Sequence, residues 1–249
     1  MRILNREDIT KNETRLSQII FLRESFIFNM GDNKMNKQLQ EILDDKDFNS
    51  QELIDFLRAD VGDRFEADAG LWEGYSIKEH TLMALGQFEK YFASQNFPKY
   101  FSRGIFRLFL ALHDIGKPDA IAQGDKNLQH KFTVPIIRKI LAKYCIGKTQ
   151  TDIACALIDI DIPGDYIRDR ISLECAVQKL HQNAKRAKLP TEKFFELLLI
   201  FYKCDAGSYT VDAGGFESLD FLFEFDYISG KLCFAKDVEH KIQEIKSQF

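Results

Sequence analysis

The chain has 249 residues, 45% of them hydrophobic, so it is long enough and apolar enough to bury a substantial core. Its 34 basic and 38 acidic residues give a net charge of −4, which offers no broad basic surface for duplex DNA or an anionic membrane. A small phosphorylated substrate is still compatible with this charge, because one local cation is enough to attract it.

The N-terminal residues and the cysteines indicate the compartment. Residues 1–15 are highly charged and lack the apolar segment of a signal peptide, and no run approaches the ~18 apolar residues that a membrane span needs. The five cysteines form no CxxC pair, which argues against a disulfide framework and a zinc ribbon. They are Cys145, Cys155, Cys175, Cys204 and Cys233. We expect a cytoplasmic protein with no membrane association.

Two amphipathic stretches predict a helical extension over residues 1–70. One covers residues 16–28, and the other runs from Leu39 to Leu57. Neither carries a group of residues typical of a catalytic site. We therefore expect this extension to cover the main domain or to bind a protein partner.

A helix is predicted to begin at Ser76. The run from Ser76 to Glu79 is a capping box, in which the hydroxyl and the carboxylate satisfy backbone donors at the helix start. His80 then lies in the first turn, at the border of the apolar face that Phe88 marks. A single histidine there is more often structural, so its interpretation depends on its neighbours.

The most informative stretch is FLALHDIGKPDA, residues 109–120. An apolar stripe at helical spacing leads up to His113, and Asp114 follows directly. The Gly-Lys-Pro run that begins at Gly116 is a helix-stop signal, which places Lys117 in the following turn. A core histidine beside a C-terminal aspartate is the alternative. However, a carboxylate at a helix C-terminus opposes the helix dipole and needs a positive partner, and a metal ion is such a partner.

The middle of the chain supplies further polar residues. Residues 123–129 read as a polar loop, and His130 begins the next predicted helix. A later acidic turn contains Asp159 and Asp161, which are reserve candidates for metal ligands. A long amphipathic helix is then predicted over residues 165–187, and its basic end complements the helix carbonyls.

The last candidate ligand lies on a helix that we expect to begin with Thr191 as its N-cap. Phe194, Leu198 and Phe201 form its apolar stripe. Asp205 continues this stripe at helical spacing. Burial of an ionised carboxylate is costly without a partner, so such a residue normally meets a cation or a metal.

Residues 211–249 predict a small β-hairpin and a final helix, both packed on the main domain. The hairpin strands are expected at residues 222–226 and 232–234, around a Ser-Gly turn, and the amphipathic helix follows near Val238. The predicted fold class is therefore mainly α, with a minor C-terminal β element.

Four residues share one description, because each lies near the end of a predicted helix and on or beside its apolar face. They are His80, His113, Asp114 and Asp205. Imidazole and carboxylate donors together suit a catalytic divalent ion that keeps coordination positions for water and substrate. The absence of cysteine from this set argues against a closed structural zinc site.

These motifs resemble the HD superfamily of metal-dependent phosphohydrolases, whose pattern is a histidine, a His-Asp pair and a distant aspartate on a helical bundle. The resemblance covers residues 76–210 and rests on EHTLMAL around His80, LFLALHDIGKP at the pair and FYKCDAG around Asp205. It implies an HD-type helical bundle over residues 71–210, between the extension and the hairpin region. It also implies that the four residues hold a divalent ion, either Mn, Fe, Co, Ni, Zn or Mg.

The resemblance further implies a mechanism. A bound ion lowers the pKa of its water from 15.7 towards about 7 and polarises the phosphoryl oxygen. Asp114 would bind the metal and orient the water, and Lys117 would neutralise phosphate charge. Lys117 has an alternative role as a solvated lysine that complements the helix end. His130 matches a histidine that often opens the next helix in the family, and it would donate a proton to the leaving oxygen or join the ligands.

The expected function is hydrolysis of a phosphate ester of a nucleotide or a related small molecule. One alternative is a phosphodiesterase for a signalling nucleotide or a phosphodiester-linked modification, and another is an inactive regulatory or scaffold module. Some family members hold a second metal through a further histidine pair. This chain offers only Asp159 and Asp161 there, so we expect a single metal.

Overall fold

The computed structural model describes residues 35–70, 74–159, 161–216, 218–226 and 228–249. Asn36–Phe249 forms one compact unit. This unit includes residues 36–70, which were predicted to belong to the N-terminal extension. The amphipathic stretch predicted at residues 16–28 lies outside the described residues.

The unit is mainly helical. Its helices are α2 (Lys37–Asp44), α3 (Ser50–Val61), α4 (Ile77–Tyr91), α5 (Arg103–Leu112), α6 (Lys117–Ala122), α7 (Gln129–Lys143), α8 (Lys148–Ile158), α9 (Ile162–Ile167), α10 (Leu173–Ala187), α11 (Thr191–Gly207) and α12 (Lys236–Lys246). Strands β1 (Phe223–Asp226) and β2 (Lys231–Phe234) pair antiparallel, with Phe223 opposite Phe234. The prediction of a mainly α fold with a C-terminal hairpin and helix is confirmed.

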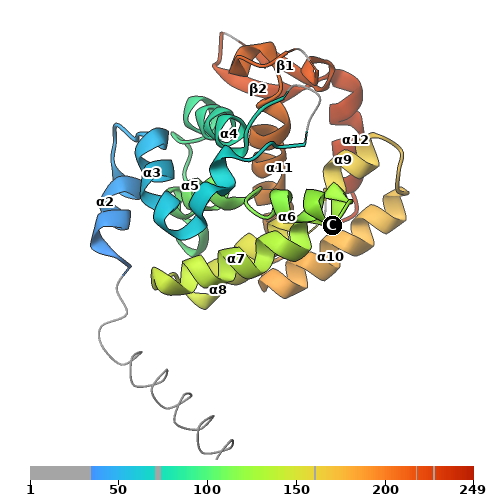
Figure 1. Ribbon diagram of the computed structural model, residues 1–249. Helices are drawn as coiled ribbons and strands as arrows, with labels where there is room; N and C mark the ends of the chain where they lie inside the picture. Colours follow the sequence, from blue (N-terminus) through green and yellow to red (C-terminus); the bar gives the residue numbers. More distant parts are fainter. Residues whose placement is uncertain (1–34, 71–73, 160, 217, 227) are drawn as a thin grey trace, which may run out of the picture. The chain divides into compact units, whose positions relative to one another are not determined.

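Helix α11 runs through the middle of this unit (Figure 1). It packs against α4 and α10 and also contacts α8 and α9, while α4 packs on α5. Phe109 of α5 meets Phe201 of α11 with their ring centroids 4.8 Å apart. These contacts bring the start of α4, the end of α5 and the last turns of α11 to one place.

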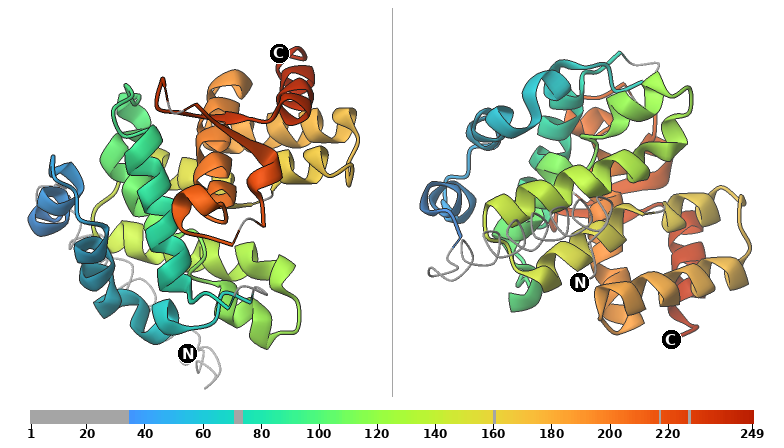
Figure 2. Two further views of the ribbon diagram at one scale, coloured as in Figure 1. Left: turned by 90° about the horizontal axis from the view of Figure 1, so that it is seen from above. Right: turned by 60° about the horizontal axis from the view of Figure 1, so that its bottom comes forward.

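A buried arginine ties α2 to this core. Arg107 of α5 is 2% exposed, donates to the backbone carbonyl of Leu43 at 2.6 Å and pairs with Glu89 of α4 at 2.7 Å. Its charge is balanced by Glu89, so burial does not leave it unpaired. Helices α2 and α3 lie on the opposite side of the unit from α12 (Figure 2).

The helix that carries His80 begins as predicted. The Ser76 hydroxyl accepts from the backbone N–H of Glu79, and the Glu79 carboxylate accepts from the N–H of Ser76 at 2.8 Å. This reciprocal cap fixes the first turn of α4 and therefore the position from which His80 projects.

Three local predictions are wrong. The helix expected over residues 165–187 is divided, because α9 ends at Ile167 and α10 begins after Ser172, whose hydroxyl accepts from the N–H of Cys175. Thr191 is the first residue of α11, and Pro190 occupies the cap position. The Gly-Lys-Pro run starts a helix instead of ending one. Helix α5 has already ended at Leu112, and Lys117 is the first residue of α6, with a proline in its first turn.

The C-terminal elements pack on the bundle. Helix α12 contacts α9, α10 and β2. Among the described helices, none has both the length and the apolar character needed to cross a membrane.

Candidate metal centre

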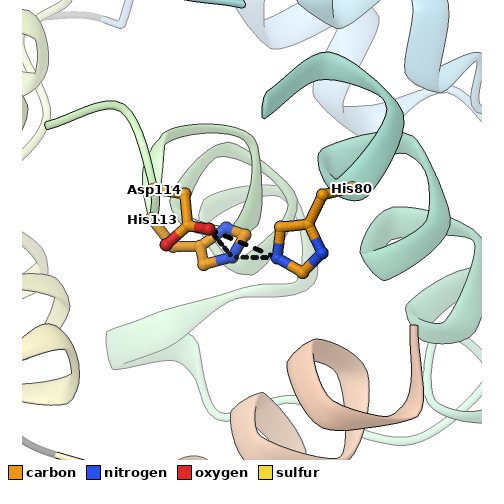
Figure 3. A group of neighbouring side chains, drawn as sticks. All are labelled: His80, His113 and Asp114. Carbon is orange, nitrogen blue, oxygen red and sulfur yellow. Dashed lines mark hydrogen bonds and ion pairs between the residues drawn. The ribbon is translucent and has the colours of Figure 1, made fainter. Parts of the chain in front are cut away.

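Three helices place the four predicted ligands. His80 lies in the first turn of α4, His113 is the C-cap residue of α5 with Asp114 directly after it, and Asp205 lies in the last turn of α11. His80, His113 and Asp114 are each at most 3% exposed. Figure 3 shows the His113 and Asp114 side chains facing the ring of His80 across the gap between α5 and α4.

The donor atoms of these side chains converge. The Nε2 atoms of His80 and His113 lie 3.1 Å apart. An Asp205 carboxylate oxygen lies 3.0 Å from His80 Nε2 and 3.4 Å from His113 Nε2. An Asp114 oxygen lies 3.4 Å from His80 Nε2 and 3.8 Å from His113 Nε2. The four residues predicted from the sequence therefore come together at one site.

The hydrogen bonds of the outer ring nitrogens define which imidazole nitrogens face inward with a lone pair. Nδ1 of His113 lies 2.6 Å from the backbone carbonyl of Leu110, which only accepts hydrogen bonds. Nδ1 of His113 must therefore carry the proton. In the neutral ring, Nε2 then presents its lone pair to the site.

The outer nitrogen of His80, Nδ1, is likewise fixed by a hydrogen bond, here with Ser208, which directly follows α11. The Ser208 hydroxyl donates to the Asp205 carbonyl at 2.6 Å and lies 3.1 Å from Nδ1 of His80. Because the hydroxyl proton is already used, Ser208 accepts from Nδ1 of His80. Both Nε2 atoms thus present lone pairs beside two carboxylates, and such a group of acceptors needs a cation between them.

Without a metal ion, bound protons supply part of the positive charge that these nitrogen and oxygen acceptors need. Burial alone would lower the pKa of His113, but the charges of Asp114 and Asp205 outweigh it and raise the pKa from 6.5 to about 9. Partial removal of the Asp205 carboxylate from water would raise its pKa, whereas hydrogen bonds from His113 and His80 hold that pKa well below its usual range. The site therefore attracts positive charge strongly.

The donor set fits a divalent metal ion. The ligand atoms of His80, His113 and Asp114 lie within 4.8 Å of one another, and Asp205 adds a carboxylate oxygen beside both imidazoles. Each imidazole donates its outer N–H to an oxygen, which is the usual support of a metal-binding histidine. Two imidazoles and two carboxylates suit a catalytic ion better than a structural one.

Lys117 lies against the site rather than in solvent. It is 8% exposed, and its ammonium donates to Asp114 at 2.7 Å. Burial would raise the pKa of Asp114, but the charges of Lys117 and of the two histidines keep that pKa below its usual value. The alternative of a solvated lysine is wrong, because residue 117 opens the buried start of α6 instead of lying in an exposed turn.

The other polar candidates lie further out. His130 is half-buried in the first turn of α7, and none of the hydrogen bonds or ion pairs found among the described residues joins it to the four ligands. Asp159 pairs with Arg186. Asp161 caps α9 by accepting from the N–H of Gly164 at 2.9 Å, and it lines a cavity with His113 and Asp205.

This cavity has a volume of about 160 Å³ and adjoins the candidate metal centre. Helices α8, α9 and α11 supply most of its walls. Asp205 borders it, and this explains why its side chain is 36% exposed rather than buried as the apolar stripe predicted. The candidate metal centre is therefore open to the cavity at the edge that Asp205 forms.

Two site residues were not found from the sequence. Ser208 holds His80 as described, and Tyr209 stacks on the His80 ring with centroids 4.8 Å apart and an interplanar angle of 13°. The Tyr209 hydroxyl lies 3.4 Å from Nε2 of His80. Both directly follow Gly207, the last residue of α11, and only the packing of α11 against α4 shows their role.

No family model, curated protein or solved structure matches the chain.

Proposed function

We propose that this chain is an HD-type metal-dependent phosphohydrolase that cleaves the phosphate ester of a nucleotide or a related small molecule. One observation carries the proposal. The inward nitrogen lone pairs of His80 and His113 converge with the carboxylates of Asp114 and Asp205 on a buried point beside a cavity. The resemblance of the HDIGKP run to the HD pattern supports the same activity.

When bound at this point, a divalent ion supplies an acidified water and a Lewis acid for the phosphoryl oxygen. Hydrolysis adds the water oxygen to phosphorus and breaks the bond from phosphorus to the alcohol oxygen. The buried imidazoles are fixed by Leu110 and Ser208, so no reorganisation is needed to present their lone pairs. Asp205 is the proposed ligand that borders the cavity together with His113, so it would lie next to a bound ester.

Lys117 and His130 have distinct proposed roles. The Lys117 ammonium holds the Asp114 carboxylate and adds positive charge beside the phosphate. His130 is the proposed proton donor to the leaving oxygen, since its neighbour Gln129 lines the cavity. A cytoplasmic location is consistent with five free cysteines.

The test is a metal-replete activity screen. The protein, stripped with a chelator and reloaded separately with Mn, Fe, Co, Ni, Zn or Mg, is assayed on p-nitrophenyl phosphate, bis-p-nitrophenyl phosphate and a panel of nucleotides. We expect hydrolysis of a monoester that requires metal and is lost on chelation. Selective cleavage of the diester would instead establish a phosphodiesterase. A protein that binds no metal and gains no thermal stability from any of these ions would be a scaffold, contrary to the proposal.

A further inference from the structure

The cavity beside the metal centre contains polar groups that the proposed hydrolysis does not use. Its wall away from the ligands includes Asp161, Tyr202 and Gln129, with apolar side chains such as Leu157 and Leu198 between them. Among the residues that the structure describes, no lysine or arginine lines it. Because a phosphate group needs positive charge or several N–H donors, this wall is poorly suited to bind phosphate.

Tyr202 points to a missing hydrogen-bond partner. Tyr202 is 5% exposed, and its hydroxyl has no hydrogen-bond partner among the described residues. Tyr202 lines the cavity, and buried polar groups in folded proteins are nearly always hydrogen-bonded, so its unpaired, buried hydroxyl calls for an explanation. A ligand in the cavity would provide one.

Asp161 has acceptor capacity to spare on the same wall. One oxygen accepts from the N–H of Gly164 at 2.9 Å, and the other lies 3.5 Å from Arg168. Each carboxylate oxygen can accept two hydrogen bonds. Arg168 partly balances the negative charge of Asp161, so Asp161 does not require a full positive charge in the cavity. A neutral donor such as an alcohol hydroxyl would use the remaining acceptor capacity of the carboxylate without adding charge.

We infer that this cavity binds the hydroxyl-bearing alcohol portion of the substrate, with Asp161 accepting from a sugar hydroxyl and the Tyr202 hydroxyl donating to a sugar oxygen. The inference rests on the proposed function, because it assigns the part of the phosphate ester that lies next to the reacting phosphate. A volume of about 160 Å³ is smaller than the roughly 300–1,000 Å³ typical of pockets for drug-sized ligands. The cavity therefore takes one sugar-sized group and leaves any nucleobase outside.

The test compares three phosphate esters that differ in the alcohol portion. Metal-loaded wild-type protein, Asp161→Asn and Tyr202→Phe are assayed on ribose 5-phosphate, p-nitrophenyl phosphate and O-phosphoethanolamine. Loss of a hydrogen bond to a charged acceptor is expected to raise KM for ribose 5-phosphate roughly tenfold in Asp161→Asn, and Tyr202→Phe is expected to raise it by a smaller factor of about fivefold. The kcat/KM ratio of ribose 5-phosphate to p-nitrophenyl phosphate should fall in both variants.

Two further measurements separate the inference from the proposed function. Binding of D-ribose, followed by ligand-observed NMR, needs no turnover and should weaken in both variants. Asp63→Asn, an exposed aspartate on η1 (Gly62–Glu66), is the matched control and should behave as wild type. Tyr202→Phe should keep the wild-type melting temperature, because the hydroxyl has no partner to lose within the described part of the chain.

Each outcome decides one of the two claims. Hydrolysis of none of the esters by the loaded wild type overturns the proposed function, and ribose binding that still depends on Asp161 would nevertheless support the cavity assignment. An unchanged ester ratio in both variants, or ribose binding unaffected by both, overturns the inference. Preference of the wild type for O-phosphoethanolamine over ribose 5-phosphate also overturns it, because the cavity would then select an ammonium group.

Discussion

The Nε2 atoms of His80 and His113 lie 3.1 Å apart, although both nitrogens carry lone pairs when the rings are neutral. Two such acceptors repel each other unless a proton or a metal ion lies between them. The outer nitrogens are already committed to Leu110 and Ser208, so the rings cannot turn away without losing those hydrogen bonds. The same contact therefore explains both the proton affinity of the metal-free site and its proposed metal affinity.

The first prediction concerns pH. Burial lowers the pKa of His113, but Asp114 and Asp205 raise it to about 9 from an ordinary value of 6.5. A raised histidine pKa stabilises the metal-free protein fully below pH 6.5, and this contribution, up to roughly 3 kcal/mol, is lost as the pH rises to 9. Metal binding requires the neutral imidazole and strengthens over the same window. The melting temperature of the metal-loaded protein, measured by calorimetry, should exceed that of the chelator-treated protein by a difference that increases from pH 6.5 to 9.

The control for this pH effect is His113→Gln, which removes the titrating group. Its metal-free melting temperature should vary less between pH 6.5 and 9 than that of the wild type. A wild-type melting temperature that stays flat over this range in chelator would contradict the assignment of a proton to the site.

The second prediction concerns Ser208, which fixes the tautomer of His80. Ser208→Ala removes the acceptor of the Nδ1 proton and should weaken metal binding by about 10–100-fold, as is usual for the outer partner of a metal-binding histidine. Ser247→Ala is a matched control, because Ser247 caps α12 and donates to the carbonyl of Glu244 in the same local geometry. Competition with a fluorescent chelator measures both affinities. Equal affinities in the two variants would show that Ser208 only caps a helix.

The third prediction concerns Lys117. Lys117→Met leaves the buried Asp114 without its cation and should lower the stability of the metal-free protein by about 3–5 kcal/mol. Saturating metal should restore part of this loss, since the ion replaces the ammonium beside Asp114. Denaturant unfolding with and without metal tests this expectation. Lys193→Met is a control, because the Lys193–Glu196 pair has the same spacing but lies on the surface. No metal-dependent recovery would argue that the ion does not contact Asp114.

Turnover of Lys117→Met is a separate readout. If the ammonium also neutralises substrate charge, kcat at saturating metal should fall by about 10²–10³. A kcat equal to that of the wild type would confine Lys117 to the support of Asp114.

The fourth prediction is that one metal ion binds tightly per chain. Asp159 is paired with Arg186, and Asp161 already accepts from Gly164, so neither residue is arranged as a ligand to a second ion. Isothermal titration should give a single tight site whose stoichiometry is the same in Asp161→Asn. Two sites of similar affinity in the wild type, with one lost in Asp161→Asn, would instead assign the cavity to a second metal.

The sequence was sufficient to predict features that depend on neighbouring residues. The capping box of α4 and the apolar stripe of α5 fix their histidines through local geometry, so His80 and His113 were placed correctly on their helices. The break after Ile167 was missed because the amphipathic pattern continues across it, although Asp169 adopts a positive φ of 55° there.

Features that depend on packing between helices were beyond prediction from the sequence. The contact of Ser208 with His80 joins residues 128 positions apart, and it exists only because α11 packs on α4. The solvent-facing edge of Asp205 arises from the cavity between α8, α9 and α11, which an apolar stripe cannot indicate. The same holds for Tyr202, because only the folded structure shows that its hydroxyl has no hydrogen-bond partner among the described residues.

The most direct test of the metal centre is elemental analysis of purified protein after loading and removal of free metal. The wild type and the exposed-site control Asp63→Asn should each retain about one divalent ion per chain. Asp114→Asn keeps the shape of the side chain and an oxygen for Lys117, so it should fold while retaining little metal and no hydrolytic activity. Full metal occupancy in Asp114→Asn, or a wild type that retains none after loading, would contradict the assignment.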